Sequence, residues 1–243
     1  MREFEQMEQE YFVHPSDADK YFEKWKQERM QWYINLGIKK ENLRFRPHTK
    51  DELAHYAKAA EDIEYQFPFG WNEIEGIHNR GDWDLSRHSK FSGEDLSETD
   101  AKTGKKFYPY IIETSAGADR ITLVCLVDAY SEEKDRIVLK LIPKIAPYKV
   151  AVFPLLRNKP ELVKKAQEIY QDLKKDFVAD FDDRGNIGKR YYSQDEIGTP
   201  FCVTVDFETL ENDSVTVRYR DTMKQERIKV SELKNYLNML LFK

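Results

Sequence analysis

The sequence predicts a mixed α/β (α+β) protein of two domains, spanning residues 1–145 and 146–243. Short apolar or alternating stretches are followed by stretches with helical spacing, which is typical of sheets packed against helices. The pattern changes after a charged join near residue 145, and 243 residues suffice for two ordinary domains. Apolar residues make up 40% of the chain and charged residues 34%, so packed cores and a well-solvated surface are both expected.

Composition excludes several classes of protein. The 14 Tyr, 14 Phe and 4 Trp argue against disorder. The net charge of −5 gives no global attraction to nucleic acid, so any RNA contact requires a local basic face. Cys125 and Cys202 lie in apolar runs without zinc-ligand spacing, so we expect buried reduced thiols, no zinc and a cytoplasmic protein. No stretch of about eighteen apolar residues predicts a membrane span.

The first predicted element is a strand in REFEQMEQEYFV. It carries an unusual number of carboxylates, whose desolvation is costly unless the acidic face borders a polar cavity. His14-Pro15-Ser16-Asp17 ends the strand, and Ser16 or Asp17 can cap the helix expected from Ala18 to Leu36, which Gly37 ends. The opening of the chain therefore already indicates a site.

Further elements of the first domain follow in order. A second helical stretch is expected over residues 50–63, then a strand and turn in NEIEGIHNRGDWDL. Residues 86–106 are polar and rich in turn formers, which predicts a surface loop. KFYPYIIETSAG predicts a strand, and ADRITLVCLVDAYSEE the helix that follows it.

The second domain alternates more regularly. Strands are expected in KVAVFPLL, VADFDD, FCVTVDF, SVTVRYRD and ERIKV, and helices over residues 159–176, 189–198 and 231–242. Between them, GNIG forms a glycine loop. This order predicts a mixed sheet layered with helices, over about 100 residues.

A small-residue turn in Glu113-Thr114-Ser115-Ala116-Gly117-Ala118-Asp119-Arg120 joins an apolar strand to a helix. Small residues there let a ligand approach backbone N–H groups, and Arg120 adds a cation suited to phosphate. An ordinary tight turn, with Arg120 paired to Asp119 or a surface acid, is the alternative. Glu73 and Glu75 have the chemistry to bind Mg²⁺, or they form a solvated strand face.

Several long segments resemble bacterial and archaeal-type glycyl-tRNA synthetases. REFEQMEQEYF, AHYAKAAEDIEYQFPFGWNEIEGI, DWDL and ETSAGADR occur in that family's order and spacing. KIAPYKVAVFPLL, GNIGKRYYSQDEIGTPFCVTVDF and VTVRYRDTM are similar to its anticodon-binding domain. The resemblance implies the end of a class II catalytic domain, with part of its antiparallel sheet and helices, followed by a mixed-sheet anticodon-binding domain.

The resemblance also implies ligand-binding residues. Those for ATP are Arg2, Glu3, Phe4, Glu73, Ile74, Gly117, Ala118, Asp119 and Arg120. Those for glycine are Phe4, Glu5, Gln6, Met7, Glu8, Glu113, Thr114, Ser115, Ala116 and Gly117. Phe4 would stack on adenine, Glu8 would face the glycine ammonium, and Arg120 would clamp the γ-phosphate. Arg120 and Glu73 would be the catalytic pair, with Glu73 a Mg²⁺ ligand.

The implied activity is that of a glycine–tRNA ligase, with ATP and Mg²⁺ as cofactors and glycine and tRNA-Gly as partners. The glycine carboxylate would attack the α-phosphate of ATP, and the glycyl group would then pass to tRNA. The sequence departs from the family at Thr114, where Pro is usual. Motif 1, with the dimer surface of the homodimeric family, and the first strand of motif 2 are expected upstream of Met1, so we expect little activity from this chain alone.

The second domain has a local basic balance. Residues 140–190 contain twelve Lys or Arg and seven Asp or Glu. Arg184, Lys189 and Arg190 are the predicted tRNA contacts, beside aromatic residues suited to unpaired bases. Lys164, Lys165, Lys174 and Lys175 are better explained as the solvated face of a helix.

A non-catalytic tRNA- or nucleic-acid-binding relative of the synthetases is the alternative function. It is free to lose the active-site residues, all of which are retained here: Phe4, Glu8, Glu73, Ser115, Gly117 and Arg120. A free-standing anticodon-domain protein is disfavoured, because about 140 residues precede that domain.

Overall fold

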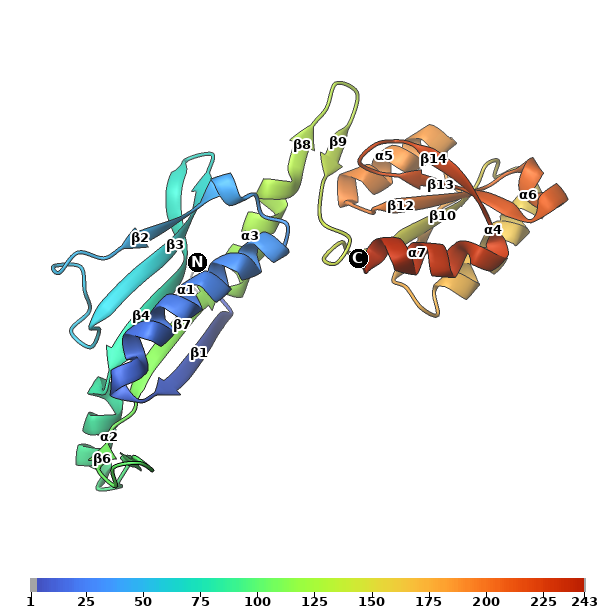
Figure 1. Cartoon of the computed structure of the whole chain (residues 1–243). Helices are drawn as coiled ribbons and strands as arrows, with labels where there is room; N and C mark the ends of the chain where they lie inside the picture. Colours follow the sequence, from blue (N-terminus) through green and yellow to red (C-terminus); the bar gives the residue numbers. More distant parts are fainter. Residues whose placement is uncertain (1–3, 243) are drawn as a thin grey trace. The chain divides into compact units, whose positions relative to one another are not determined.

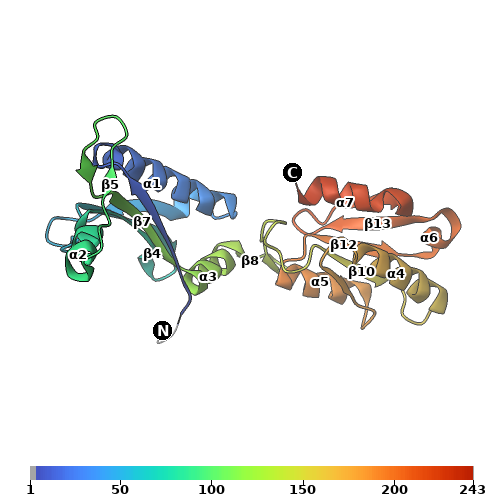
Figure 2. The ribbon, with the colours of Figure 1, turned by 90° about the horizontal axis from the view of Figure 1, so that it is seen from below.

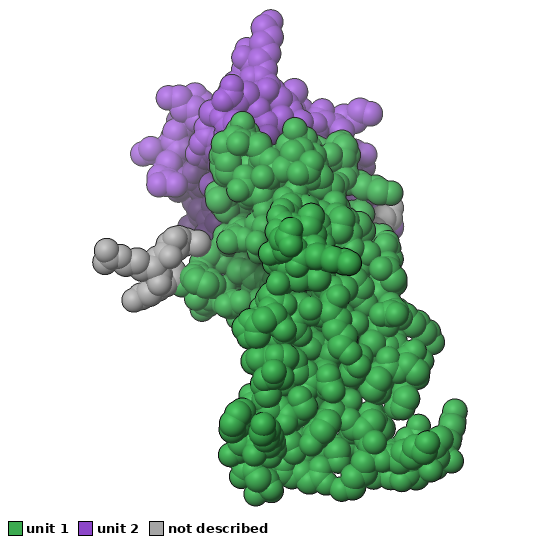
Figure 3. Space-filling model, turned by 90° about the vertical axis from the view of Figure 1, so that its left-hand side faces the viewer, with its two compact units in different colours: residues 1–128 green, residues 129–243 purple. Residues whose placement is uncertain are grey.

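The computed structural model describes residues 4–242 and divides the chain into two compact units. The first unit ends at Asp128 and the second begins at Ala129 (Figure 3). The predicted fold class is confirmed, since one unit holds an antiparallel sheet and the other a mixed sheet. Within the described residues, no helix has the length and apolar character needed to cross a membrane.

Five strands form the main sheet of the first unit, in the order β1-β7-β4-β3-β2 with antiparallel neighbours throughout. Their bounds are Gln6–Val13 (β1), Leu43–Pro47 (β2), Ala59–Phe67 (β3), Gly70–Gly81 (β4) and Tyr110–Gly117 (β7). Helix α1 (Ala18–Asn35) lies across one face of this sheet (Figures 1 and 2). Tyr33 of α1 packs there against Ile77 and Ile112, and α3 (Ala118–Ala129) adds Val124 to the same core.

The helix expected over residues 50–63 is absent, and β3 occupies the end of that stretch. Residues 50–58 form turns instead. The polar side chains of β3 form ion pairs with neighbouring elements, as in the 2.5 Å contact between Lys26 Nζ and Glu61 Oε2. These partners allow acidic residues to sit in a half-buried strand, and they are not visible in the local sequence.

The segment expected to be a polar loop at residues 86–106 is partly helical. Helix α2 spans Trp83–Ser92 and ends at Gly93, whose φ of 81° is the left-handed conformation that favours glycine at a helix terminus. A two-stranded ribbon of β5 (Glu98–Thr99) and β6 (Lys106–Phe107) follows.

The second unit begins with a hairpin of β8 (Tyr130–Glu132) and β9 (Ile137–Leu139). Its main sheet has the order β11-β10-β12-β13-β14, with β10 parallel to β11 and β12 and the other pairs antiparallel. The bounds are Val150–Pro154 (β10), Ala179–Phe181 (β11), Phe201–Val205 (β12), Ser214–Tyr219 (β13) and Gln225–Lys229 (β14).

Helices cover both faces of the second sheet (Figures 1 and 2). The apolar sides of α4 (Pro160–Leu173) and α7 (Leu233–Leu241) pack in one core with Val152, Val203 and Val217. On the other face, α5 (Ile187–Ile197) packs over Phe153 and Cys202. The short helix α6 (Phe207–Asn212) follows β12 in the chain. Cys125 and Cys202 are both free thiols, and burial raises the pKa of Cys202.

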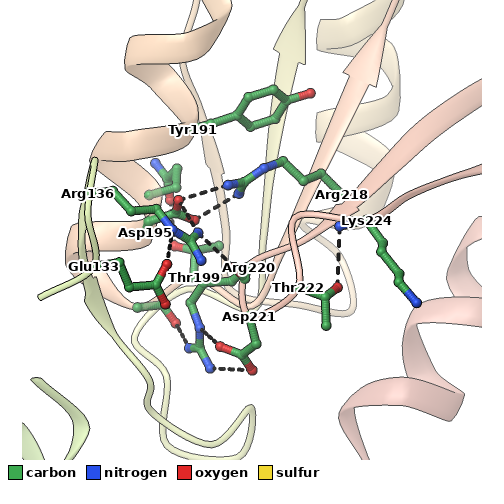
Figure 4. Close-up of polar contacts among 12 residues, drawn as sticks. Glu133, Arg136, Tyr191, Asp195, Thr199, Arg218, Arg220, Asp221, Thr222 and Lys224 are labelled. Atoms are coloured by element: carbon green, nitrogen blue, oxygen red, sulfur yellow. Dashed lines mark hydrogen bonds and ion pairs between the residues drawn. The ribbon is translucent and has the colours of Figure 1, made fainter. Parts of the chain in front are cut away.

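The β8–β9 hairpin is joined to the second sheet by a buried carboxylate (Figure 4). Asp195 of α5 accepts hydrogen bonds from Arg136 Nη1 at 2.7 Å and from Arg218 Nη1 and Nη2 at 2.8 and 2.9 Å. All three side chains are at most 4% exposed. The hairpin therefore belongs to the second unit, whereas the sequence-based boundary assigned it to the first domain.

Replacing this carboxylate is expected to loosen the second unit. Asp195→Asn leaves the buried guanidinium of Arg218 without a counter-charge and Arg136 with Glu133 alone, so we expect a loss of about 3–5 kcal/mol in the stability of α5 and β13. Hydrogen exchange of the backbone amides in those two elements measures the loss locally.

The control is Glu208→Gln, which removes a 2.7 Å ion pair between Arg227 and an exposed carboxylate. Such pairs contribute about 0–1 kcal/mol. Equal, small effects of the two substitutions would show that Asp195 does not anchor the hairpin.

Candidate active site

The register between β1 and β7 assembles a polar surface on the first sheet. Gln6 lies opposite Gly117, Glu8 opposite Ser115, and Glu10 opposite Glu113. Directly opposed residues share one face of a sheet, and the alternate residues Tyr11 and Ile112 pack in the core beside α1. The carboxylates of the opening strand therefore gather on the face that α1 leaves uncovered.

A cavity of about 280 Å³ lies at one end of this surface. It is lined by Phe4, Gln6, Glu73, Ile74, Ser115, Ala116, Gly117, Asp119 and Arg120. Every one of these residues is among those predicted to bind ATP or glycine. They come from the start of β1, from β4, and from the junction of β7 with α3, so segments about forty or more residues apart in sequence form one cleft.

Hydrogen bonds hold the beginning of β1 against the small-residue turn. The Ala118 amide donates to the Glu5 carbonyl at 2.9 Å, and the Glu5 amide donates to Asp119 Oδ2 at 3.1 Å. Inside the cavity, Gln6 Nε2 donates to Ser115 Oγ at 2.6 Å, and Ser115 Oγ lies 3.5 Å from Glu8 Oε1. Ser115 thus links the cavity to the acidic row beyond it.

Arg120 pairs across the cleft and not with its neighbour Asp119. Its Nη1 donates to the Glu73 carbonyl at 2.7 Å and lies 3.5 Å from Glu73 Oε1. Both side chains are about half exposed, at 46% and 54%. An exposed pair of this kind is weak and separates at little cost when a ligand offers better partners.

Some predicted residues lie away from the cavity wall. Met7 and Thr114 belong to the alternate positions of their strands, on the α1 side of the sheet, so only their backbone borders the site. Glu8 and Glu113 extend the polar face beyond the cavity, beside Ser115. The predictions for Arg2 and Glu3 fall outside the described residues.

The neighbouring carboxylates Glu73 and Glu75 have different environments. Glu75 is 1% exposed and faces α1, where Arg29 Nε and Nη2 donate to its two oxygens at 2.6 and 3.1 Å. Burial and this carboxylate raise the pKa of Tyr33. Glu75 is therefore a structural residue, and neither of the alternatives considered for it, a Mg²⁺ ligand or a solvated face, fits its position.

No group of three or more potential metal ligands occurs among residues 4–242. Glu73 alone offers the cavity a carboxylate from β4. Mg²⁺ is commonly held by one or two carboxylates together with substrate phosphates, so a single carboxylate fits that ion when nucleotide is present.

Glu113 is the most tightly held carboxylate on the polar face. It is 6% exposed, accepts a hydrogen bond from Arg80 Nη1, and lies 3.4 Å from His78 Nδ1. His78 and Arg80 together hold the pKa of Glu113 below its usual range, although burial opposes them. Arg80 was not among the residues predicted from sequence; the four-residue spacing to Asp84 in NRGDWD was the available signal.

The predicted tRNA contacts of the second unit divide into exposed and buried residues. Lys189 is exposed, and Arg184 is 86% exposed beside Asp182. Arg190 is only 2% exposed, and its Nη1 donates to the carbonyls of Pro154 at 2.6 Å and Asp182 at 3.3 Å. A guanidinium buried in this way ties loops together and does not present itself to RNA, so its predicted contact does not fit its position.

The lysines of α4 and of the two positions that follow it behave as a solvated helix face. Lys165 pairs with Asp213 at 2.6 Å and Lys175 with Asp172 at 3.2 Å. Lys174 lies 5.7 Å from the centre of the Tyr170 ring. With Arg190 buried, Arg184 and Lys189 remain as the exposed cations predicted to contact tRNA near the start of α5.

Comparison with known proteins relates both units to one group of enzymes. The family model described as an anticodon binding domain matches residues 149–240. A glycine–tRNA ligase of Caldanaerobacter subterraneus subsp. tengcongensis is 54% identical over 240 residues, or 97% of this chain and 51% of that protein. Those of Borrelia hermsii and Thermobifida fusca are 53% and 52% identical, each over 97% of this chain and 54% of the relative. The chain spans about half the length of the curated relatives it matches.

The two carboxylates of β4 provide a stability test. Glu75→Gln removes the buried partner of Arg29, so we expect the protection of β4 and α1 amides against hydrogen exchange to fall by about 3–5 kcal/mol. Glu73→Gln, on the exposed side of the same strand, is expected to cost less than about 1 kcal/mol. A cost for Glu73→Gln that matches that of Glu75→Gln contradicts the assignment of the two faces.

Proposed function

This chain is a relative of the glycine–tRNA ligases that matches their C-terminal part, and from that premise we propose that its first unit binds ATP and glycine and its second unit binds the anticodon end of tRNA-Gly. The observation that carries the first half is the cavity, because its nine lining residues were all predicted from sequence as ligand-binding residues. Three separate segments supply them, which an unrelated surface hollow does not explain.

The cavity has the chemistry to hold a nucleotide. Phe4 offers an aromatic face for adenine at its entrance, and it is 57% exposed. Gly117 and the first turn of α3 bring backbone N–H groups and the positive end of a helix to the wall. Arg120 then leaves its weak pair with Glu73 and binds phosphate, where its charge is better compensated.

Release of Arg120 also frees Glu73. This carboxylate would then hold Mg²⁺ beside the phosphates, and the ion would supply further neutralisation of phosphate charge. In the proposed reaction, the glycine carboxylate attacks the α-phosphate, pyrophosphate leaves, and the glycyl group passes to the terminal ribose of tRNA. No side-chain nucleophile takes part, so the residues of this chain act by positioning and by charge stabilisation.

The acidic row gives the glycine ammonium its partners. Glu8 and Glu113 flank Ser115 on the same face, and Gln6 already binds the Ser115 hydroxyl. Glu8 and Glu10 lie beside Glu113 on adjoining strands, and Arg80 pairs with Glu113 alone, so a cationic ligand would reduce the remaining repulsion among the three carboxylates. Because glycine has no side chain, selectivity requires a site too small for larger amino acids.

In the second unit, the sheet topology supports an RNA site at one edge of the sheet. The chain leaves β10 for β11 on one side and returns to β12 on the other, so the strand order reverses at β10. Ligands of such sheets bind outside the carboxyl ends of the strands at that reversal. Arg184 and Lys189 lie between β11 and the first turn of α5, at this edge.

Gly117→Ala separates ligand binding from folding. A Cβ at Gly117 would lie 3.7 Å from Arg120 Cβ and 3.9 Å from the Glu5 carbonyl oxygen, which are ordinary contacts. We therefore expect stability to change by less than about 1 kcal/mol, while the affinity for Mg²⁺-ATP falls at least about tenfold because the methyl group enters the cavity. Calorimetric titration of the full chain measures the affinity.

The same titration tests the proposal itself. Failure of the unaltered chain to bind Mg²⁺-ATP, with tRNA binding intact, would favour the non-catalytic nucleic-acid-binding function. The control Gly104→Ala lies in the β5–β6 turn, away from the cavity, where a Cβ meets nothing within 4 Å but φ is 69°. It is expected to cost some stability and no ATP affinity.

Removing the exposed cations at the start of α5 is expected to weaken tRNA binding. Arg184→Ala combined with Lys189→Ala should flatten the slope of log affinity against log salt concentration by about 1.4, at roughly 0.7 for each single-stranded phosphate contact. Filter binding of tRNA-Gly over a range of salt concentrations provides the measurement.

The matched control is Lys174→Ala with Lys175→Ala, which removes two cations at the end of α4 and is expected to leave the slope unchanged. An equal change in both double variants would indicate diffuse attraction to RNA and contradict the assigned edge.

A further inference from the structure

The carboxylate of Glu113 is held from outside the candidate site by Arg80, which does not line the cavity. Arg80 lies at the end of β4, next to the β-bulge between Asn79 and Gly81, and its Nη1 donates to Glu113 Oε2. The pair is well shielded from water, because the two side chains are 19% and 8% exposed.

Arg80 is itself fixed by two further contacts. Its Nε and Nη2 donate to the two oxygens of Asp84 on α2, at 2.8 and 3.0 Å. Its guanidinium carbon lies 4.4 Å from the centre of the Tyr56 ring. A planar guanidinium with a bidentate carboxylate on one edge and an aromatic ring on its face has little freedom to rotate. The remaining Nη1 therefore points to Glu113 in a fixed direction.

The surroundings of Glu113 explain why a fixed cation is needed. Glu10 lies directly opposite on β1, Glu8 is the next residue along the same face, and His78 lies opposite on β4. Two neighbouring carboxylates and burial all favour the protonated form of Glu113, which cannot pair with an ammonium group. Among the groups around it, Arg80 carries a charge that persists at every physiological pH.

We propose that Arg80 is a positioning residue for the glycine site, which keeps Glu113 ionised and orients its other oxygen, Oε1, to accept from the ammonium group of the amino acid. The proposal rests on the proposed function, in which Glu113 borders glycine. Its structural alternative is that Arg80 only joins α2 to the sheet through Asp84. The positioning role and the structural role make different predictions for a variant of Arg80 that still folds: only the positioning role predicts a loss of glycine recognition.

The experiment compares two probes with the full chain. One is the sulfamoyl analogue of glycyl-adenylate, which carries the glycine ammonium; the other is adenosine sulfamate, which lacks the glycyl group. Arg80→Gln is expected to lower the affinity for the glycyl probe at least about tenfold relative to the affinity for adenosine sulfamate, because only the glycyl probe requires an ionised Glu113. Arg80→Lys keeps the positive charge but loses the bidentate guanidinium geometry. It should restore part of the affinity for the glycyl probe.

Lys26→Gln is the matched control. It removes a partly buried ion pair with Glu61 on the α1 side of the same sheet, and it should not alter the preference between the probes. If Arg80→Gln does not fold, Asp84→Asn loosens the orientation of Arg80 while its charge remains, and a reduced preference for the glycyl probe is again expected.

Outcomes for the two proposals are distinguishable. If the unaltered chain binds neither probe, the proposed function fails and Arg80 loses its role with it. If the unaltered chain prefers the glycyl probe and Arg80→Gln keeps that preference, only the role of Arg80 is refuted.

A second readout needs no ligand. Titration of the Glu113 carboxyl followed by carbon NMR should show a lowered pKa in the unaltered chain and a higher one in Arg80→Gln. Because this pKa is depressed by the fold, the stability gained from ionised Glu113 is present above the unfolded pKa and is lost as pH falls through the folded pKa. An unchanged titration would refute the charge-holding role.

Discussion

The antiparallel pairing of β1 with β7 is the constraint on which the candidate site depends. It joins residues more than a hundred positions apart and sets Glu8 opposite Ser115 and Gln6 opposite Gly117. A shift of one residue would turn the acidic row toward α1 and the apolar row toward water. The core contacts of Tyr11 and Ile112 oppose that shift, so hydrophobic packing on one face determines the arrangement of charges on the other.

The same separation of faces explains what the sequence could predict about the fold. The apolar strands of the second unit are bounded by turns, and their bounds agree with the prediction to within a few residues. β3 was misassigned because its acidic residues are compensated by residues distant in sequence: Glu61 by Lys26, Asp62 by His48 and Glu64 by Arg44. Tertiary ion pairs override the local pattern there, and a single sequence does not reveal which charges will meet.

For the candidate site, the cavity wall was predictable and the supporting residues were not. The segments that line the cavity carry small residues or clustered charges, which are informative locally. Arginines are different, because their role depends on burial and partners. Arg190 belongs to a basic, glycine-rich segment yet binds backbone carbonyls inside the second unit, while Arg80 was overlooked and contacts the acidic row. Sequence gives the charge of such a residue but not the surface that it faces.

Two arginine–glutamate pairs of the first unit differ in whether the carboxylate can still accept a hydrogen bond from a ligand. Arg29 of α1 binds both carboxylate oxygens of Glu75 beneath the helix, so the pair has no capacity for a ligand. In the pair of Arg80 and Glu113, the arginine is satisfied by Asp84. Among residues 4–242, the second oxygen of Glu113 has His78 Nδ1 at 3.4 Å as its neighbour, without a completed hydrogen bond. A carboxylate that is held ionised but incompletely hydrogen-bonded retains capacity for a further donor, and an ammonium group supplies one. On the proposed function, incomplete satisfaction, more than charge itself, is what would distinguish Glu113 as a recognition group from the structural Glu75.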